Sequence, residues 1–268
     1  MSLEVKHLTH TYSAGSAFQA TAVHDVSLTI EDGEFVCIVG HTGSGKSTLV
    51  QHLNGLLKPT SGQVLVDGED MNGEGVDRRR IRQKVGLVFQ YPEYQLFEET
   101  IAKDIAFGPK NQGLSEEEID QRVRRAMAHV HLDYDKYAER SPFDLSGGQM
   151  RRVAIAGVLA MEPKVLILDE PANFVDNKFE KELYRTLHEL NTRMAIVMVS
   201  HDIGTITSVV KEIVCVNRRV HRHRSNVLTE EQLRNYDCPI QLVSHGHIPH
   251  TVLEHHPGDG CCDHDSVR

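Results

Sequence analysis

Short apolar runs recur along the chain, separated by longer segments of mixed character. Runs of four or five apolar residues with turns at their ends are typical of strands that are buried on both faces of a parallel sheet. Helical patterns occupy most of the segments between them, and this alternation predicts an α/β sheet covered on both faces. The predicted strands are residues 35–39, 85–89, 165–168, 195–199 and 213–216.

The first part of the chain has a different pattern. Apolar and polar residues alternate in residues 3–6 and 22–28, and residues 63–66 add a further strand before the tight turn Asp67-Gly68. Alternation with a period of two indicates strands with one buried face. We therefore expect an N-terminal β-subdomain of short strands.

The stretch from about residue 100 to residue 143 is highly charged and helical in pattern. Ser115 and Glu118 have the spacing of a capping box, and Val123, Met127 and Val130 follow along the helix. We expect a helical subdomain, about residues 96–149, inserted between core strands. After about residue 218 the character changes again, so the predicted domains are residues 1–220 and a His/Cys-rich extension, residues 221–268.

Composition narrows the class of protein. The 268 residues include 29 basic and 38 acidic side chains, a formal net charge of −9, which predicts no nucleic-acid surface. No apolar run approaches the roughly 18 residues of a membrane helix, and the first residues do not have the pattern of a secretory signal. Five cysteines without framework spacing favour a reducing compartment. If the protein serves a membrane, we expect it to do so from the cytoplasmic side.

One octapeptide carries the strongest chemical signal. Residues 40–47 fit the phosphate-binding pattern G-x-x-x-x-G-K-[ST], and they lie between a predicted buried strand and a predicted helix, residues 47–53. Backbone N–H groups and the positive end of that helix would form an anion site. Lys46 would neutralise the β- and γ-phosphates, and the Ser47 hydroxyl would hold Mg²⁺. The pattern therefore predicts binding of a nucleoside triphosphate.

A second apolar run, residues 164–168, ends in two carboxylates. Asp169 is suited to a water-mediated contact with Mg²⁺, and Glu170, just past the strand end, could polarise the attacking water. Taken alone, the pair could equally be an acidic turn after a buried strand. Its occurrence together with a phosphate-binding loop favours a metal and catalytic role.

A second glycine-rich helix start lies at Leu145-Ser146-Gly147-Gly148-Gln149. A serine before a glycine pair that opens a helix, here predicted from Gln149 through Met161, makes another backbone anion site. A phosphate loop, this pentapeptide and an apolar strand ending in Asp-Glu occur together in the ATP-binding subunits of ABC transporters. The sequence resembles that family.

The resemblance implies a fold and further site residues. The implied fold is an α/β P-loop NTPase with a RecA-like parallel core, an N-terminal antiparallel β-subdomain and an inserted helical subdomain. Tyr12 resembles the aromatic residue that stacks on adenine; the alternative is an exposed strand tyrosine. His201 resembles the histidine that contacts the γ-phosphate, with a structural histidine as the alternative. Gln90 resembles the glutamine that touches Mg²⁺ and couples to the membrane subunit, and Asp176 the aspartate that crosses the dimer interface.

Three sets of site residues follow from the motifs and the resemblance. The catalytic residues are Glu170, His201 and Gln90. The Mg²⁺ ligands are Ser47, Gln90 and Asp169. The nucleotide-binding residues are Tyr12, Gly40, His41, Thr42, Gly43, Ser44, Gly45, Lys46, Ser47, Thr48, Asp169, Ser146, Gly147, Gly148, Gln149 and Asp176.

The family also implies partners. Two of its nucleotide-binding subunits sandwich ATP head to tail, with the phosphate loop from one chain and the Ser146–Gln149 segment from the other. We therefore expect a homo- or heterodimer that uses ATP and Mg²⁺, an integral membrane transporter subunit as partner, and no nucleic acid. The expected location is peripheral, at the cytoplasmic face of the cell membrane.

Residues 1–170 resemble one group within the family, the energy-coupling factor group, whose ATPases drive uptake of vitamins and of cobalt or nickel. The segments that carry this resemblance lie where the family contacts its membrane partner; the alternative is that they are generic for any ABC subunit. They are residues 54–62 (NGLLKPTSG), 89–97 (FQYPEYQLF), Thr100-Ile101 and residues 104–109 (DIAFGP).

The rest of the chain departs from that group. Residues 172–180, 199–205 and 214–218 resemble the zinc/manganese-uptake ABC ATPases, as does the His/Cys-rich tail. This favours a mosaic with a joint near Pro171. We expect the energy-coupling factor assignment to hold, because the segment that contacts the partner lies in the first part, and we keep a zinc/manganese importer as the alternative.

The tail contains the ligand types that Zn²⁺ prefers, but their spacing matches no closed structural site. A weak Zn²⁺ site and a solvated tail both stay open. The residues concerned are His245, His247, His250, His255, His256, Cys261, Cys262 and His264.

We expect an ATP-hydrolysing, membrane-peripheral subunit that energises import. A soluble ABC ATPase without a transporter is disfavoured because the chain has neither a long coiled-coil insertion nor a second cassette. An inactive, nucleotide-gated subunit is disfavoured because Lys46, Asp169, Glu170 and His201 are all present.

Overall fold

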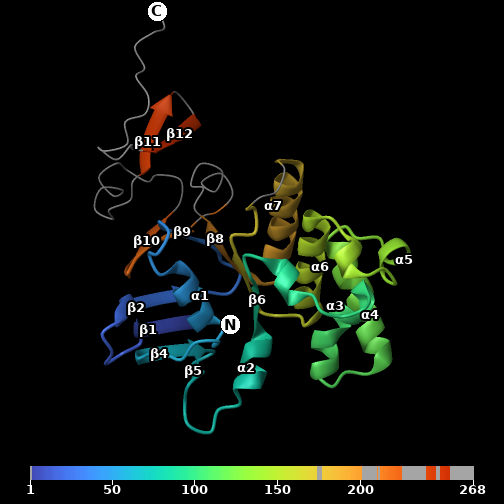
Figure 1. Ribbon diagram of the computed structural model, residues 1–268, viewed down its shortest axis with the longest axis horizontal. Helices are drawn as coiled ribbons and strands as arrows, with labels where there is room; N and C mark the ends of the chain where they lie inside the picture. Colours follow the sequence, from blue (N-terminus) through green and yellow to red (C-terminus); the bar gives the residue numbers. More distant parts are fainter. Residues whose placement is uncertain are drawn as a thin grey trace, which may run out of the picture.

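Two sheets and a group of helices beside them make up the main body of the computed structural model (Figure 1). The structure describes residues 2–173, 177–200, 210, 212–224, 240–245 and 248–253. Among these residues, no helix is long and apolar enough to cross a membrane.

The central sheet has six strands in the order β10-β9-β3-β8-β7-β6. Its five parallel strands are the five that the apolar runs predicted. The sixth strand, β10, pairs antiparallel with β9 and was not predicted; this hairpin continues past residue 220. The strands are β3 (Phe35–Val39), β6 (Val85–Val88), β7 (Val165–Asp169), β8 (Ala195–Ser200), β9 (Glu212–Asn217) and β10 (Arg219–Arg224).

Side chains of the parallel strands enter two separate cores, one on each face of the sheet. In β3, Phe35, Cys37 and Val39 pack on the helical side, whereas Val36 and Ile38 pack toward the second sheet. Successive side chains of a strand point to opposite faces. A strand that is covered on both faces therefore needs apolar residues at every position, which explains the continuous runs.

The second sheet is antiparallel, in the order β2-β1-β4-β5. Its first two strands are longer than the pattern predicted. Irregularities of register between Val5 and Leu8, and from there to Thr11, interrupt the alternation without ending β1. A bulge of this kind changes which face a side chain meets, so the two-residue period is lost while pairing continues. The strands are β1 (Leu3–Tyr12), β2 (Ala20–Ile30), β4 (Ser61–Val66) and β5 (Glu69–Asp70), and α1 (Lys46–Leu53) contacts β1, β2 and β7.

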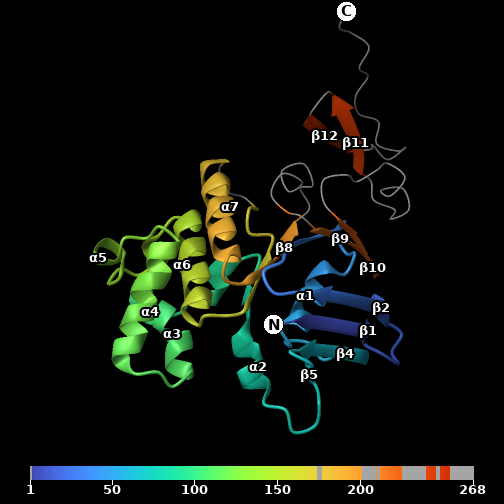
Figure 2. The same cartoon turned by 180° about the vertical axis from the view of Figure 1, so that it is seen from behind.

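The helical region lies beside the sheets, with α6 in contact with α3 and α4 (Figures 1 and 2). The predicted capping box of Ser115 and Glu118 is present at the start of α4. Helix α6 begins two residues before the predicted Gln149, because Ser146 caps it and the glycine pair forms its first turn. The elements are α3 (Ile101–Asn111), α4 (Glu116–His129), α5 (Tyr134–Tyr137), η2 (Pro142–Asp144) and α6 (Gly147–Ala160).

The remaining elements flank these layers. Helix α7 contacts α6, with the Arg152 guanidinium 2.5 Å from the Glu182 carboxylate. These elements are α2 (Arg78–Lys84), η1 (Pro92–Gln95), α7 (Asn177–Asn191) and the hairpin of β11 (Ile240–His245) and β12 (Ile248–Leu253). The architecture confirms the predicted fold class, an α/β core with an antiparallel sheet and a helical insertion.

Candidate active site

The loop between β3 and α1 has a backbone that only glycine allows at key positions. Gly45 has φ of 104°, and a Cβ built on it would lie 2.4 Å from the carbonyl oxygen of Ala22. A Cβ on Gly40 would lie 2.3 Å from the carbonyl oxygen of Val216. These contacts are with backbone of other strands, which cannot move aside as a side chain can. The loop is therefore seated against β2 and β9 by the absence of side chains.

Two of the polar side chains of this loop, Lys46 and Ser44, are buried. Lys46 is 7% exposed, and its Nζ donates hydrogen bonds to the carbonyl oxygens of Gly40 (2.6 Å) and His41 (3.0 Å). Ser44 is 1% exposed, and its hydroxyl has no hydrogen-bond partner among the described residues. A buried hydroxyl without a partner is rare in folded proteins and points to a ligand. With the positive helix end and the Lys46 ammonium beside it, the expected ligand is an anion such as a phosphate.

Asp169, at the end of β7, faces the start of α1. The Ser47 hydroxyl and the Lys46 ammonium both act on its carboxylate and favour its charged form. Burial raises the pKa of Asp169 above its ordinary value, and the Glu170 charge raises it further, while Ser47 and Lys46 act in the opposite direction. A buried carboxylate beside a hydroxyl offers the hard oxygen ligands that Mg²⁺ prefers. The predicted Mg²⁺ ligands Ser47 and Asp169 are thus brought together, and these residues fit the metal.

Glu170 follows in a strained backbone conformation. Its φ of 48° lies in the left-handed region, which is uncommon outside glycine. Its N–H donates to the carbonyl oxygen of Val199 (3.0 Å), which ties it to β8. Its carboxylate accepts hydrogen bonds from Gln90 Nε2 (3.0 Å) and from Asn173 Nδ2. The structure therefore joins the predicted residues Gln90 and Glu170 and adds Asn173, to which the sequence patterns assigned no such contact.

Arg151 is a second residue that the sequence patterns missed. It lies on α6 and is 7% exposed, and its guanidinium donates to the carbonyl oxygens of Pro171 (2.6 Å), Asn173 (2.8 Å) and Gln90 (3.4 Å). Arg151 thus ties the segments around Gln90 and after Glu170 to the helix that begins at the glycine pair. A charged residue just ahead of the apolar stretch of α6 was the available signal.

The second glycine-rich helix start is exposed and bonded within its own region. Ser146 and Gln149 form a reciprocal capping box, and Gln149 Nε2 also donates to the Tyr137 hydroxyl (3.2 Å). A Cβ on Gly147 would meet nothing within 4 Å. In the described part of the chain, the side-chain hydrogen bonds of this segment stay among the helices and none reaches the phosphate loop.

Tyr12 lies at the end of β1 and next to the first turn of α1. Its hydroxyl is hydrogen-bonded to the Thr48 hydroxyl (3.2 Å), and the residue is 42% exposed. In the loop itself, His41 Nδ1 donates to the carbonyl oxygen of Thr42 (2.8 Å).

Several predicted residues fall outside the part of the chain described. These are Asp176 and His201 of the site and, in the tail, His247, His255, His256, Cys261, Cys262 and His264. His245 and His250 lie in β11 and β12, but their side chains are not described. Among the described residues, no group of three or more His, Cys, Asp or Glu side chains could hold a metal ion.

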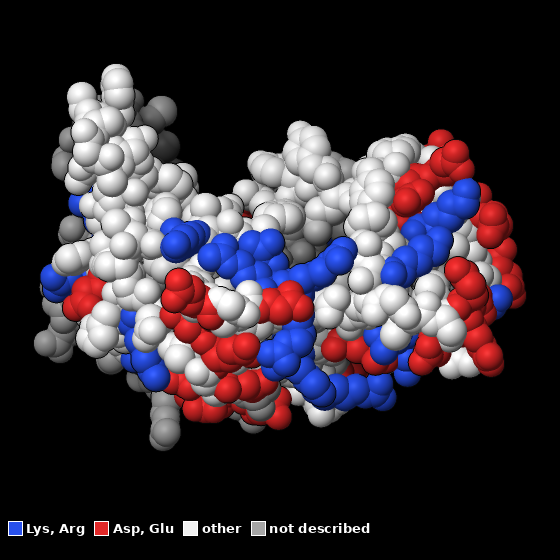
Figure 3. All heavy atoms as spheres, turned by 90° about the horizontal axis from the view of Figure 1, so that it is seen from below, with Lys and Arg blue, Asp and Glu red and all other residues white. Residues whose placement is uncertain are grey.

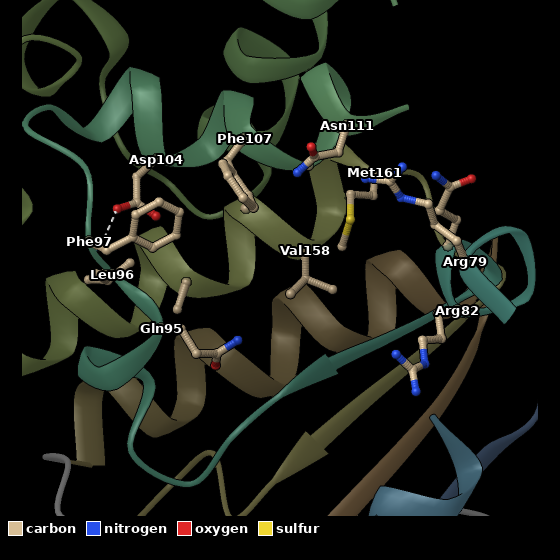
Figure 4. A pocket seen from close by; sticks show the side chains of 14 residues that line it. Arg79, Arg82, Gln95, Leu96, Phe97, Asp104, Phe107, Asn111, Val158 and Met161 are labelled. Atoms are coloured by element: carbon tan, nitrogen blue, oxygen red, sulfur yellow. Dashed lines mark hydrogen bonds between the residues drawn. The ribbon is translucent and has the colours of Figure 1, made fainter. Parts of the chain in front are cut away.

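A groove lies beside the segment that follows Gln90. Its volume is about 590 Å³, and its walls include Leu96, Phe97, Phe107, Val158 and Met161 (Figure 4). The buried Asp104 carboxylate accepts from the backbone N–H groups of residues 97 and 98 (2.8 and 2.9 Å), which fixes this wall to α3. Arg79 and Arg82 of α2 stand at one end of the groove.

Comparison with known proteins agrees with this geometry. The family model of ABC transporters matches residues 23–173, and the chain belongs to that family. The chain is 54% identical over 220 residues to the energy-coupling factor transporter ATP-binding protein EcfA2 of Clostridium tetani, covering 81% of this chain and 76% of that protein. It is 55% identical over 215 residues to the EcfA2 of Clostridium acetobutylicum, covering 80% and 75%.

Two solved structures have the same fold. One is cbiO1 from Clostridium perfringens, part of the ABC transporter complex cbiONQ, with a TM-score of 0.75, 35% identity and coverage of 87% of this chain and 92% of that one. The other is the dimeric post-hydrolysis state of the ATP-binding cassette MJ0796 bound to ADP and Pi, with a TM-score of 0.74, 31% identity and coverage of 84% and 100%.

The comparisons do not support the predicted mosaic. An alignment of 220 residues to one energy-coupling factor ATPase is longer than the 170 residues assigned to that resemblance, so the similarity continues past Pro171. The zinc/manganese resemblance of the later segments rests on the sequence patterns alone.

Proposed function

We propose that this chain is the ATP-binding and ATP-hydrolysing subunit of an energy-coupling factor importer for a vitamin or for cobalt or nickel. One observation carries the proposal: the carboxyl edge of the central sheet holds Ser47 against Asp169, and Gln90 against Glu170. Hydrolysis of a nucleoside triphosphate needs a phosphate-binding loop, a carboxylate that can bind Mg²⁺ and a second carboxylate that is held in place by hydrogen bonds. The EcfA2 relatives supply the transporter class.

In this proposal each site residue has a role, which its position supports where the structure describes it. Backbone N–H groups of residues 40–48, together with Lys46, hold the phosphates, and Tyr12 stacks on adenine. Ser47, Asp169 and Gln90 would hold Mg²⁺, and the bound ion would supply positive charge beside the phosphate oxygens. Glu170 polarises the attacking water and is oriented by Gln90 and Asn173. His201 and Asp176 keep their implied roles at the γ-phosphate and at the dimer interface.

The site is completed by a second subunit. The exposed start of α6 presents backbone N–H groups that no described bond directs to the phosphate loop of the same chain, and Gly147 leaves room for a ligand. The dimeric cassette MJ0796 has the same fold. We infer that Ser146, Gly147, Gly148 and Gln149 bind the γ-phosphate of ATP held by a partner, in a homo- or heterodimer.

Motion reaches the membrane partner through the segment after Gln90. Only four residues separate Gln90 from Gln95, whose Oε1 accepts from the N–H of Phe89 (2.9 Å), and the next residues line the groove in Figure 4. Arg151 ties the carbonyl oxygen of Gln90 to α6, which forms the opposite wall. A shift of Gln90 on hydrolysis would therefore change the groove in which the transmembrane subunit docks. We place the protein at the cytoplasmic face of the membrane, as a peripheral subunit.

Basic side chains of α2, Arg79 and Arg82, lie at one end of the groove. Five of the seven residues of α2 are basic, and Figure 3 shows basic side chains gathered in a band near the centre of the lower face. Two further expectations belong to the proposal: residues 1–220 form the nucleotide-binding domain with its helical subdomain at about residues 96–149, and residues 221–268 form a His/Cys-rich extension, for which a weak Zn²⁺ site and a solvated tail both stay open.

The substitution Glu170→Gln tests the catalytic part of the proposal. Loss of the carboxylate removes general-base help, which is worth about 10²–10⁴ in rate, while the phosphate contacts remain. We expect ATP binding to be retained, a dimer to accumulate with ATP and the turnover number to fall by that factor. Glu162→Gln is the matched control, because this exposed glutamate precedes β7 and pairs only with Arg122 and Arg125 among the described residues. Unaltered turnover in Glu170→Gln would remove Glu170 from its role.

Purification of the tagged chain from its native membranes tests the transporter class. A shared transmembrane coupling protein together with small substrate-binding membrane proteins is the expected result, and the latter would identify the cargo. Recovery of a zinc-type permease instead would contradict the energy-coupling factor assignment.

A further inference from the structure

Two histidines connect the tyrosine at the end of β1 to the phosphate-loop helix. His10 and Tyr12 lie on β1, and Thr48 and His52 lie on α1, one turn apart. His52 is 0% exposed and His10 is half-buried. The four residues form a closed circuit in which each contacts the next, and Thr48 takes part through both its hydroxyl and its backbone carbonyl.

The direction of the hydrogen bonds in this circuit follows from its acceptors. The carbonyl oxygen of Thr48 lies 2.7 Å from His52 Nδ1, so this nitrogen must carry the proton and donate. His52 Nε2 is then an acceptor when the ring is neutral, and it accepts from His10 Nδ1 at 3.2 Å. Burial lowers the pKa of His52, which favours this neutral state. The carbonyl oxygen of Lys58 also acts on this ring and favours its charged form, so the contact with Thr48 specifies the tautomer of the neutral His52 ring only.

The circuit closes through Tyr12. The His10 ring stands edge-on to the Tyr12 ring, with 4.6 Å between centroids and planes at 83°. The Tyr12 hydroxyl is hydrogen-bonded to the Thr48 hydroxyl at 3.2 Å. Tyr12 is therefore held both at its ring and at its hydroxyl, by groups that lead to α1. Because α1 begins at Lys46, the position of the Tyr12 ring relative to the phosphate loop is set by this circuit.

We propose that His10 and His52 are positioning residues for adenine: they hold Tyr12 at the distance from the phosphate loop that ATP requires. The inference rests on the proposed function, in which Tyr12 stacks on adenine and the loop binds the phosphates. An apolar pair at these two positions would fill the same space without desolvating two imidazoles, yet it would not hold a ring in one orientation. The histidines act through Tyr12 and do not touch the nucleotide.

The test separates binding of the base from binding of the phosphates. Dissociation constants of ATP and of inorganic tripolyphosphate, each with Mg²⁺, are measured for the full chain. In His10→Ala we expect ATP binding to weaken about tenfold, because the hydrogen bond to His52 and the aromatic contact with Tyr12 are lost. Tripolyphosphate binding should be unchanged. His10→Asn, whose amide can still donate to His52, should recover part of the ATP affinity. His188→Ala is the control, since it removes a histidine that stands edge-on to Phe35 instead.

A second variant distinguishes the proposed role of the histidines from a general folding defect. Thr48→Val keeps the shape of the side chain and the carbonyl oxygen that His52 uses, but removes the hydroxyl bonded to Tyr12. It should also weaken ATP binding selectively. The inference is overturned if ATP binding is unchanged in His10→Ala, or if ATP and tripolyphosphate binding fall equally in both variants. If the unsubstituted chain binds neither ligand, the proposed function itself fails, and the inference with it.

Discussion

The molecule contains two glycine-rich helix starts that are built differently, one at residues 40–47 before α1 and one at Ser146–Gln149 before α6. In the first, glycines are required by the chain itself, because added side chains would collide with the backbone of β2 and β9. Lys46 and Ser44 are buried within it, and the Ser47 hydroxyl at its end acts on the carboxylate of Asp169. In the second, nothing lies within 4 Å of a Cβ on Gly147, and the side chains of Ser146 and Gln149 each accept from the backbone N–H of the other residue.

The difference indicates what each site lacks. The first holds a buried hydroxyl with no described partner and needs only a ligand. The second has capped its own helix start and leaves Gly147 exposed, with nothing within 4 Å of a Cβ at that position. Glycine is therefore a packing requirement of the chain itself in the first helix start, and at Gly147 in the second it is not.

The largest expected effect breaks the first site and spares the second. In Gly45→Ala the new methyl would meet the Ala22 carbonyl oxygen, at a φ that alanine disfavours. We expect the free energy of unfolding to fall by more than about 3 kcal/mol and ATP binding to be lost. Denaturant unfolding and ATP titration measure the two effects.

Gly147→Ala is the matched change in the second site. It should leave the free energy of unfolding within about 0.5 kcal/mol and ATP binding by the single chain intact, because the position is open and lies in a helix. Hydrolysis by the dimer should fall, since the methyl would stand where the partner's nucleotide approaches. Equal loss of stability in both variants would remove the distinction between the two sites.

A second prediction concerns the link between the two sites, Arg151. Arg151→Met keeps the length of the side chain but leaves carbonyl oxygens of residues 90, 171 and 173 without their donor. We expect the free energy of unfolding to fall by about 2–3 kcal/mol, and turnover to fall more than ATP affinity, because Gln90 loses its support.

The neighbouring Arg152→Met is its control. Arg152 pairs with Glu182 and the carbonyl oxygen of Val130 and makes no described contact with the Gln90 segment. It should cost less stability and leave the ratio of turnover to affinity unchanged. If both variants lower that ratio, the effect of Arg151 is only structural.

The smallest expected effects come from two serine substitutions, one in each helix start, which should have opposite effects on stability and on ATP binding. Ser146→Ala removes the capping box of α6 and should lower the free energy of unfolding by about 1 kcal/mol, with ATP binding by the single chain unchanged. Ser44→Ala removes a buried hydroxyl that has no described partner, so it should not lower stability but should weaken ATP binding. Thermal unfolding and ATP titration of the two variants would show opposite patterns; matching patterns would contradict the comparison.

The elements that could be predicted are those with a local cause. The parallel strands were recognisable because burial on both faces requires apolar residues throughout, and the capping box of Ser115 and Glu118 because its two partners are three residues apart. The extents of β1 and β2 were not, because bulges interrupt the alternation. Strand β10 was missed because Arg219–Arg224 is polar and lies at the edge of the sheet.

The same division holds within the site. By itself the sequence determined the phosphate loop, the carboxylate pair and the glycine-rich start of α6, because each is a motif whose residues are neighbours in the chain. Only the tertiary structure decided that Gln90 bonds Glu170 across 80 residues, that Arg151 ties both segments to α6, and that His10 and His52 join β1 to α1. A hydrogen bond between distant residues exists only once the order of the strands and the packing of the helices bring donor and acceptor within about 3 Å, and no local pattern records that distance.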